Sequence, residues 1–166
     1  MTFVVREFIL QQCDSNHYGK GMVKMKTVEI YTDGACKGNP GKGGWGVVLI
    51  YGQHQKTIFG GEPSTTNNIM ELTAVIKGLE ALNEKCHVKC YSDSQYVVNG
   101  MTTWIHNWKK KGWKGSTGKP VLNEMLWKQL DELCQFHNVE FTKVKGHSGH
   151  PLNDLADELA NRGCNG

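Results

Sequence analysis

Two short runs of this 166-residue chain each end an apolar stretch with an aspartate. Tyr31-Thr32-Asp33 and Tyr91-Ser92-Asp93 share one layout, with the tyrosine two residues before the acid. Side chains alternate faces along a strand, so each tyrosine lies on the same face as its aspartate. If the two runs are neighbouring parallel strands, two carboxylates meet at one edge of a sheet. Such a pair is the beginning of a cation site.

Two further carboxylates can reach the same edge. Glu71 lies in the first turn of a predicted helix between the two strands, and Asp157 lies on a predicted helix near the C-terminus. In an open α/β sheet, ligands bind at the carboxyl ends of the strands. Four carboxylates without a thiolate or an imidazole favour Mg²⁺ or Mn²⁺ over zinc. Two such ions roughly 3.5 to 4 Å apart can activate water and stabilise the leaving oxygen in phosphodiester cleavage.

Each carboxylate also has an ordinary structural explanation. Asp33 precedes a glycine and suits a turn, and Asp93 precedes a helix and suits an N-cap. Glu71 suits the last position of a capping box that begins at Asn68, and Asp157 suits a polar helix flank. Taken singly, each of these structural explanations is favoured over the functional one. Their expected meeting at one sheet edge favours a shared chemical role.

Alternating and periodic patterns predict the elements that position these acids. Strands are expected at 28–33, 45–51 and 55–61, and they form an antiparallel meander. The glycine-rich stretch 36–44 is expected to be a turn cluster. A helix follows from Asn68 to about Asn83, and a strand at 88–93 leads into a short helix at 94–101. A right-handed crossover then sets the strand at 88–93 parallel to the first strand.

The last third of the chain completes the sheet. A helical turn or two is expected from residue 104 until Gly112, a helix over 123–135 capped by Asn123, a strand over 139–144, and a final helix over about 152–161. The pattern predicts an α/β fold with a five-stranded mixed sheet, made of an antiparallel meander plus parallel strands and flanked by helices. Residues 25–166 are expected to form one domain, and residues 1–24 an N-terminal extension of unknown role.

Composition and the cysteine positions indicate in which cellular compartment this domain works. The formal net charge is only +3, and the six cysteines are scattered, which favours reduced thiols in a cytoplasmic protein. Cys86 and Cys90 have no second ligand pair, so a zinc site there is disfavoured. The apolar residues between 3 and 10 are interrupted by charges and too few to span a bilayer, so no membrane association is expected.

Residues 104–119 form a basic segment in which tryptophans and lysines alternate. One interpretation is a solvated lysine face beside core tryptophans. The other is a nucleic-acid contact, with ammonium groups on phosphates and indoles against sugars. We favour the second, because burial of all three indoles would leave little room for the charges.

The motifs together resemble bacterial type 1 ribonuclease H over residues 26 to 162. They are the stretches 32–41, 65–72, 92–97 and 146–151, followed by Asn153 and Asp157. The resemblance implies the ribonuclease H fold and hydrolysis of the RNA strand of an RNA–DNA hybrid, leaving 3′-hydroxyl and 5′-phosphate ends. It also implies that Asp33, Glu71, Asp93 and Asp157 bind two magnesium ions.

The same resemblance implies the substrate contacts. Asparagine and glutamine side chains are expected on sugar hydroxyls and base edges in the minor groove: Asn39, Asn67, Asn68 and Gln95. Thr66 and Asn107 match a pocket for a DNA-strand phosphate. The basic segment resembles the protrusion of the bacterial enzymes, with contacts from Trp104, Trp108, Lys109, Lys110, Lys111, Trp113 and Lys114. Two positions depart from the usual pattern, Ile69 where a basic residue is common and Ala35 where serine is common.

His147 lies in a glycine-flanked loop before the helix that bears Asp157. A histidine in such a loop is often structural or solvent-exposed. An imidazole with an ordinary pKa of about 6.5 can also exchange protons near neutral pH. At this sheet edge it could protonate the leaving 3′ oxygen or aid product release, and the resemblance implies this role.

The sequence therefore predicts a monomeric, magnesium-dependent endoribonuclease acting on RNA–DNA hybrids, in which manganese can replace magnesium. One alternative is a DNA-cutting nuclease of the same fold, which would not need the asparagines that recognise hydroxyls. Another is a catalytically silent hybrid-binding module. Loss of one carboxylate would favour the silent module, and all four are present.

Overall fold

A computed structural model describes residues 25–146 and 149–166 of the chain. Its centre is one five-stranded sheet in the order β3-β2-β1-β4-β5. Strands β1, β2 and β3 are antiparallel neighbours, β4 is parallel to β1, and β5 is parallel to β4. The predicted mixed sheet is therefore confirmed. The strands are β1 Thr27–Lys37, β2 Gly41–Tyr51, β3 His54–Thr65, β4 His87–Ser92 and β5 Asn138–Lys143.

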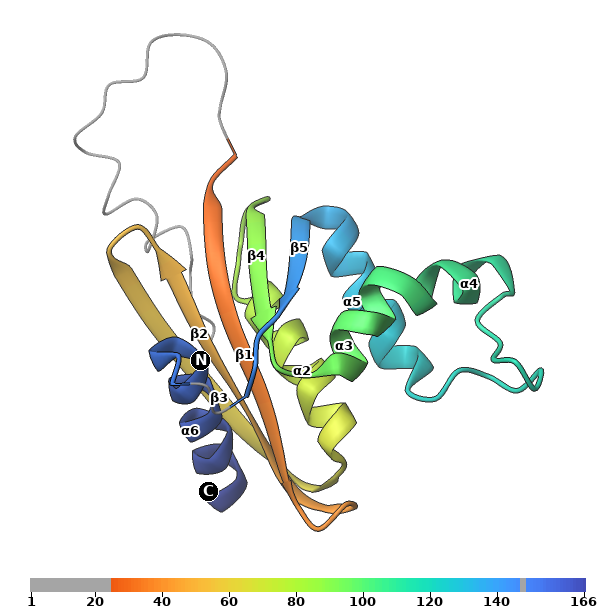
Figure 1. Ribbon diagram of the computed structural model, residues 1–166, viewed down its shortest axis with the longest axis horizontal. Helices are drawn as coiled ribbons and strands as arrows, with labels where there is room; N and C mark the ends of the chain where they lie inside the picture. The colour runs from red at the N-terminus through yellow and green to blue at the C-terminus, as the bar shows by residue number, and fades with distance from the viewer. Residues whose placement is uncertain (1–24, 147–148) are drawn as a thin grey trace, which may run out of the picture.

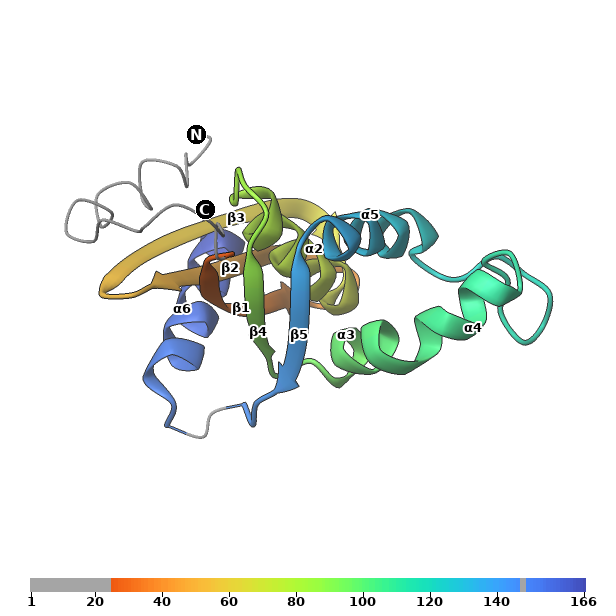
Figure 2. The same ribbon diagram turned by 90° about the horizontal axis from the view of Figure 1, so that it is seen from above.

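Helices cover both faces of this sheet. Helix α6 lies on one face, α2, α3 and α5 lie on the other, and α4 with the loop after it extends away from the sheet (Figures 1 and 2). The helices are α2 Asn67–Glu80, α3 Gln95–Asn99, the π-helical segment η2 Gly100–Trp104, α4 Ile105–Lys110, α5 Glu124–Phe136 and α6 Pro151–Asn165. The basic protrusion is thus the part of the described chain that stands out in Figure 1.

The alternation of side chains along β1 divides the core in two. Val28 and Ile30 point into the larger core with α2 and α5. Tyr31 points the other way, into a smaller core with Val48 and residues of α6. Because the period of a strand is two, Asp33 shares the face of Tyr31. The first aspartate therefore lies on the side of the sheet that α6 covers.

The expectation of a turn cluster over 36–44 is wrong. Strand β1 continues to Lys37 and β2 begins at Gly41, which leaves only residues 38–40 as the turn. The glycines of β2 allow helix and sheet to pack closely instead. A Cβ at Gly44 would lie 2.1 Å from the Ala160 carbonyl oxygen, and one at Gly46 would lie 2.5 Å from that of Ala156. Glycine lets the backbone of α6 rest directly on the strand.

Two helix predictions also need correction. The chain is helical without a break from Gln95 to Lys110, rather than in two separate pieces. Gly100 lets this helical stretch pack closely against α5, since a Cβ there would lie 2.1 Å from the Trp127 ring. Asn123 does precede α5, but its backbone is left-handed and its Nδ2 donates to Tyr96 Oη at 3.1 Å instead of capping the helix.

The cysteines that the structure describes are all free thiols. Burial raises the pKa of the Cys86 thiol to about 11, so it is an inert group rather than a ready metal ligand. Residues 1–24, and with them Cys13, lie outside the described part. No helix in the described residues is long and apolar enough to cross a membrane.

Candidate active site

Strands β1 and β4 bring the first two aspartates together. Thr32 pairs with Ser92, the last residue of β4, so Asp33 and Asp93 come next on their two strands. Asp33 is buried, and the Gly34 amide donates to its Oδ1 at 2.9 Å. The N-cap explanation of Asp93 is wrong, because Ser94 caps α3 by accepting from the Val97 amide. The carboxylate of Asp93 is therefore free to face its neighbour.

Helix α2 delivers the third carboxylate. Thr66 is its N-cap and accepts from the Ile69 amide at 3.2 Å, so the predicted cap at Asn68 is wrong. Glu71 consequently has no part in a capping box. A Cβ at Gly34 would lie 2.5 Å from the backbone nitrogen of Glu71. Glycine at this position lets the start of α2 lie against β1, which is what brings Glu71 to the aspartates.

The three acids form a cluster suited to a cation. One carboxylate oxygen each from Asp33, Glu71 and Asp93 lies within 4.8 Å of the others. Burial and the nearby Asp93 raise the pKa of Asp33 to about 8, and a hydrogen bond with Asp157 adds to this. Burial and the nearby Asp33 likewise raise the pKa of Glu71. The carboxylates repel one another when all are ionised, and a bound cation removes that repulsion.

One oxygen in this cluster lacks a partner. Oε2 of Glu71 is buried and accepts no hydrogen bond from any residue that the structure describes. A buried oxygen of this kind is ordinarily satisfied. An all-oxygen donor set with an unsatisfied member fits a hard divalent cation such as magnesium or manganese.

The fourth carboxylate lies at the border of this cluster. Asp157 is half-buried on α6 and interacts with Asp33. Asn161, one turn later, donates its Nδ2 to the carbonyl oxygen of Asp157 at 3.0 Å and to Oδ1 at 3.4 Å. Asn161 therefore helps to orient the acid, a role that the sequence interpretation missed although the i, i+4 spacing offered it.

His147 and Ser148 lie outside the described part of the chain. Gly146 packs against Asp93, since a Cβ there would lie 2.9 Å from Oδ2 of that acid. The chain just before His147 therefore passes the carboxylate cluster. The role predicted for His147 stays a prediction.

The residues expected to contact sugars lie around the cluster. Asn39, in the turn after β1, accepts from the Asn67 amide with its Oδ1 at 3.1 Å, which ties this turn to the start of α2. Asn68 and Gln95 are exposed in the first turns of α2 and α3. Thr66 Oγ1 accepts from the helix backbone, so its hydroxyl proton remains available for a phosphate.

Part of the protrusion packs against the rest of the fold. Trp104 is 36% exposed, whereas Trp108 and Trp113 are half-buried and pack against the main core. Ring centroids of Trp108 lie 6.2 Å from Trp113 and 5.1 Å from Trp127. None of the three indoles is fully buried, as expected beside so many lysines, but two of them pack against the main core while flexible lysine stems keep the charges in water.

The lysines of the protrusion are not equivalent. Lys109 forms an ion pair with Asp131, with 2.7 Å between Nζ and Oδ1. All four lysines are exposed, and so is Asn107 on α4, but Lys110, Lys111 and Lys114 form no ion pair with any residue that the structure describes. The lysines without an ion pair are therefore better placed than Lys109 to meet a phosphate backbone.

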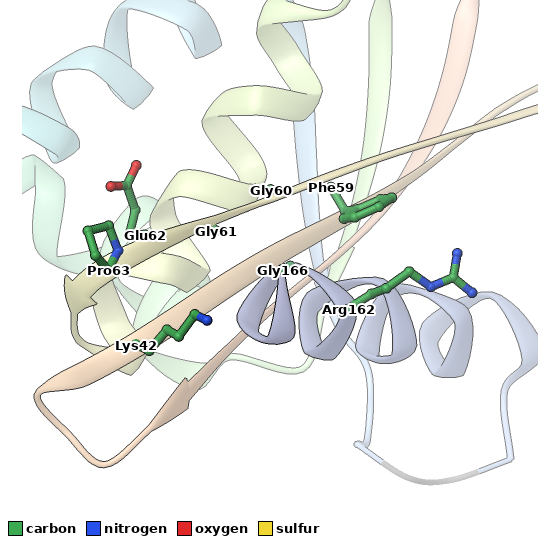
Figure 3. Close-up of a pocket in the computed structure, with 9 residues that line it drawn as sticks. Lys42, Phe59, Gly60, Gly61, Glu62, Pro63, Arg162 and Gly166 are labelled. Atoms are coloured by element: carbon green, nitrogen blue, oxygen red, sulfur yellow. The ribbon is translucent and has the colours of Figure 1, made fainter.

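A separate hollow of about 320 Å³ lies between β3 and the end of α6 (Figure 3). The Arg162 guanidinium there lies 5.9 Å from the Phe59 ring centroid. None of the four carboxylates lines this hollow. The candidate active site is thus the carboxylate cluster at the ends of β1 and β4, and not this hollow.

Known proteins are similar to the chain over nearly all of its described length. The family model for RNase H matches residues 25–165, which include all four carboxylates. Ribonuclease HI of Neisseria meningitidis serogroup B is 61% identical over 139 residues, or 84% of this chain and 96% of that protein. Ribonuclease H of Hahella chejuensis is also 61% identical, over 84% of this chain and 94% of that protein.

Solved structures of RNase H proteins have the same fold as this chain. LC9-RNase H1, a type 1 RNase H with the type 2 active-site motif, superposes with a TM-score of 0.79 at 33% identity, covering 87% of this chain and 75% of that one. LC11-RNase H1 in complex with RNA/DNA hybrid gives a TM-score of 0.60 at 26% identity, covering 83% and 96%.

Proposed function

Because this chain belongs to the ribonuclease H family, we propose that it hydrolyses the RNA strand of RNA–DNA hybrids and leaves 3′-hydroxyl and 5′-phosphate ends. The observation that carries the proposal is the cluster of three carboxylates from β1, α2 and the end of β4, with Asp157 beside it. Several relatives are named ribonuclease HI or ribonuclease H, and LC11-RNase H1 was solved with a hybrid.

In this proposal Asp33, Glu71, Asp93 and Asp157 hold two magnesium ions, which manganese can replace. When bound, these ions supply the activation of water and the stabilisation of the leaving oxygen. The carboxylates give up their protons on binding, so that an ionised cluster faces the phosphodiester. The four carboxylates come from four separate elements, β1, α2, the end of β4 and α6, which keep the donor atoms in place before the substrate arrives.

The residues around the cluster recognise the hybrid. Asn39, Asn67, Asn68 and Gln95 contact sugar hydroxyls and base edges, which distinguishes RNA from DNA at the cut site. The hydrogen bond from the Asn67 backbone amide to Asn39 Oδ1 supports this by fixing the Asn39 side chain relative to the start of α2. Thr66 and Asn107 hold a phosphate of the DNA strand, and the protrusion lies along the backbone.

We assign His147 the transfer of a proton to the leaving 3′ oxygen. General acid catalysis of this kind contributes roughly 10²- to 10⁴-fold. Replacement by alanine should lower kcat by that factor or somewhat less and spare KM. A normal kcat with a raised KM would instead assign His147 to substrate binding.

Residues 25–166 form the catalytic domain in this proposal, and the chain acts as a cytoplasmic monomer. One chain supplies every carboxylate of the cluster, so no partner is needed to complete the site. Five free thiols suit a reducing compartment.

Substitution of the carboxylates tests the proposal. Asp93→Asn and Glu71→Gln should each abolish cleavage in magnesium while hybrid binding survives, because a neutral amide cannot balance divalent charge. Asp154→Asn is the matched control, since Asp154 lies on α6 but outside the cluster. The proposal fails if either cluster variant keeps near-normal turnover, or if the control loses activity equally.

A further inference from the structure

A buried histidine lies at the edge of the sheet opposite the carboxylates. His137 directly follows α5 and precedes β5, and it is only 3% exposed. Strands β4 and β5 begin side by side there, with His87 opposite Asn138 in the parallel register (Figure 1). The carboxylates of β1 and β4 lie at the other ends of their strands. Cleavage at the carboxylate edge therefore gives this ring no task.

Both ring nitrogens of His137 bond to the backbone. The Cys86 amide, one residue before β4, donates to Nδ1 at 3.1 Å. The ring in turn donates to the carbonyl oxygen of Leu79 in the last turn of α2. Because Nδ1 is the acceptor, the donor is Nε2, and the ring is the neutral Nε2–H tautomer. One side chain thus joins the end of α2, the start of β4 and the end of α5.

The bond to Cys86 exists only while the ring is neutral. A protonated ring carries a hydrogen on both nitrogens, so Nδ1–H would face the Cys86 N–H. Cys86 is fully buried, which leaves its amide no water to replace the lost acceptor. A buried amide without an acceptor is strongly unfavourable. Protonation therefore favours a conformation in which the segment before β4 moves away from the ring.

The environment of the ring is set by burial rather than by charge. Charged or titratable side chains on the surrounding elements are Lys26 before β1, Glu80 of α2, Glu84, Lys85 and Cys86 of the next loop, Asp131, Glu132 and Cys134 of α5, His87 of β4 and Glu140 of β5. Lys26 pairs with Glu84, and His87 pairs with Glu140. Burial lowers the pKa of His137 below its ordinary 6.5, and the bond to the Leu79 carbonyl opposes this shift. Below pH 6.5 the unfolded chain thus takes up a proton that the folded chain resists, so stability falls as pH falls.

We propose that His137 is a pH-sensitive latch. Its neutral ring closes the edge of the domain where α2 ends and β4 and β5 begin, and its protonation opens that edge while the rest of the sheet stays folded. The inference is independent of the proposed function, because no carboxylate of the cluster takes part in the latch.

Nuclear magnetic resonance of the ¹⁵N-labelled parent protein tests the latch without any substitution. At pH 7 the ring should show the Nε2–H tautomer. As pH is lowered from 7 to 5, the Cys86 amide should lose protection against hydrogen exchange, corrected for its intrinsic rate, whereas the Val47 amide in the centre of β2 should keep it. An Nδ1–H tautomer, or an equal change at the two amides, would overturn the proposal.

His137→Phe keeps a ring but cannot titrate or accept from Cys86. It should be less stable than the parent at pH 7, and this difference in Tm should shrink by about 3 to 8 °C at pH 5. Asp33 titrates in both chains, so its contribution cancels in the difference.

His87→Gln is the matched control, since His87 lies at the same edge and pairs with the exposed Glu140. It should not reduce the loss of Tm below pH 6.5. A Tm difference between parent and His137→Phe that stays constant with pH, or an equal effect of His87→Gln, would overturn the latch. If His137→Phe does not fold, the tautomer and the Cys86 amide of the parent decide.

Discussion

Asp33 carries an energetic cost in the cation-free site, because burial and its acidic neighbours disfavour its ionised form. The pKa of its carboxyl lies near 8 in the fold, against an ordinary value of 3.8. Below about pH 4 both the folded and unfolded chains hold this proton. Between about pH 4 and pH 8 the folded chain keeps a proton that the unfolded chain has released. The free energy of unfolding of the metal-free protein therefore falls as pH rises through this window.

This sign gives a prediction for stability. In a chelating buffer, Tm of the parent protein should fall between about pH 5 and pH 8, and magnesium should reduce the fall. Asp33→Asn removes the titrating group, so its metal-free Tm should be flatter over the same range and higher than the parent at pH 8. Thermal unfolding followed by circular dichroism measures both. Parallel pH profiles for parent and variant would contradict the account.

Some of the site could be predicted residue by residue. The repeated Tyr-x-Asp layout located Asp33 and Asp93, because strand alternation and parallel pairing act on local sequence. The capping residue of α2 could not be chosen correctly among Thr66, Asn67 and Asn68, since each is a good N-cap by type. The backbone decides, and Thr66 is the one with extended dihedral angles.

The protrusion packs against α5 through its aromatic rings, which its composition alone does not indicate. Its tryptophans connect α4 to Trp127 of α5, and this aromatic packing gives the exposed lysines a fixed base. The partial burial of Trp108 and Trp113 was not predictable from the lysine-rich sequence, because it depends on their packing against α5. Gly100 gave a local signal of this contact, since a helix interior seldom carries glycine without a packing reason.

The lysines can be told apart by salt dependence. Lys110→Ala and Lys111→Ala should each weaken hybrid binding and flatten the slope of log affinity against log salt by about 0.9, because each loses one phosphate contact. Lys109→Ala is the matched control, since Lys109 already pairs with Asp131. Titrations by fluorescence anisotropy at several salt concentrations give the slopes. If Lys109→Ala instead flattens the slope more than Lys110→Ala or Lys111→Ala, the ion pair between Lys109 and Asp131 opens when the hybrid binds.

At the scale of the whole molecule, chain topology could be predicted well. An antiparallel meander followed by a right-handed crossover allows few strand orders in a five-stranded sheet. The predicted strand directions are confirmed. The close approach of α6 to β2 could not be predicted, because Gly44 looks like a turn residue and Gly46 like an ordinary strand position until the helix is placed on them. The same holds for His150, whose ring lies against Tyr31 on the distant strand β1.

We infer that a single chain cuts RNA in RNA–DNA hybrids by means of a carboxylate-bound divalent cation. The most direct test is cleavage of three matched substrates, an RNA–DNA hybrid, an RNA duplex and a DNA duplex, with each strand labelled in turn and Mg²⁺ titrated from zero. The account predicts that only the RNA strand of the hybrid is cut, with 5′-phosphate ends, and that the rate depends on Mg²⁺ and falls to background in chelator. Cleavage of the DNA duplex, hybrid binding without any cleavage, or full activity in chelator would contradict it.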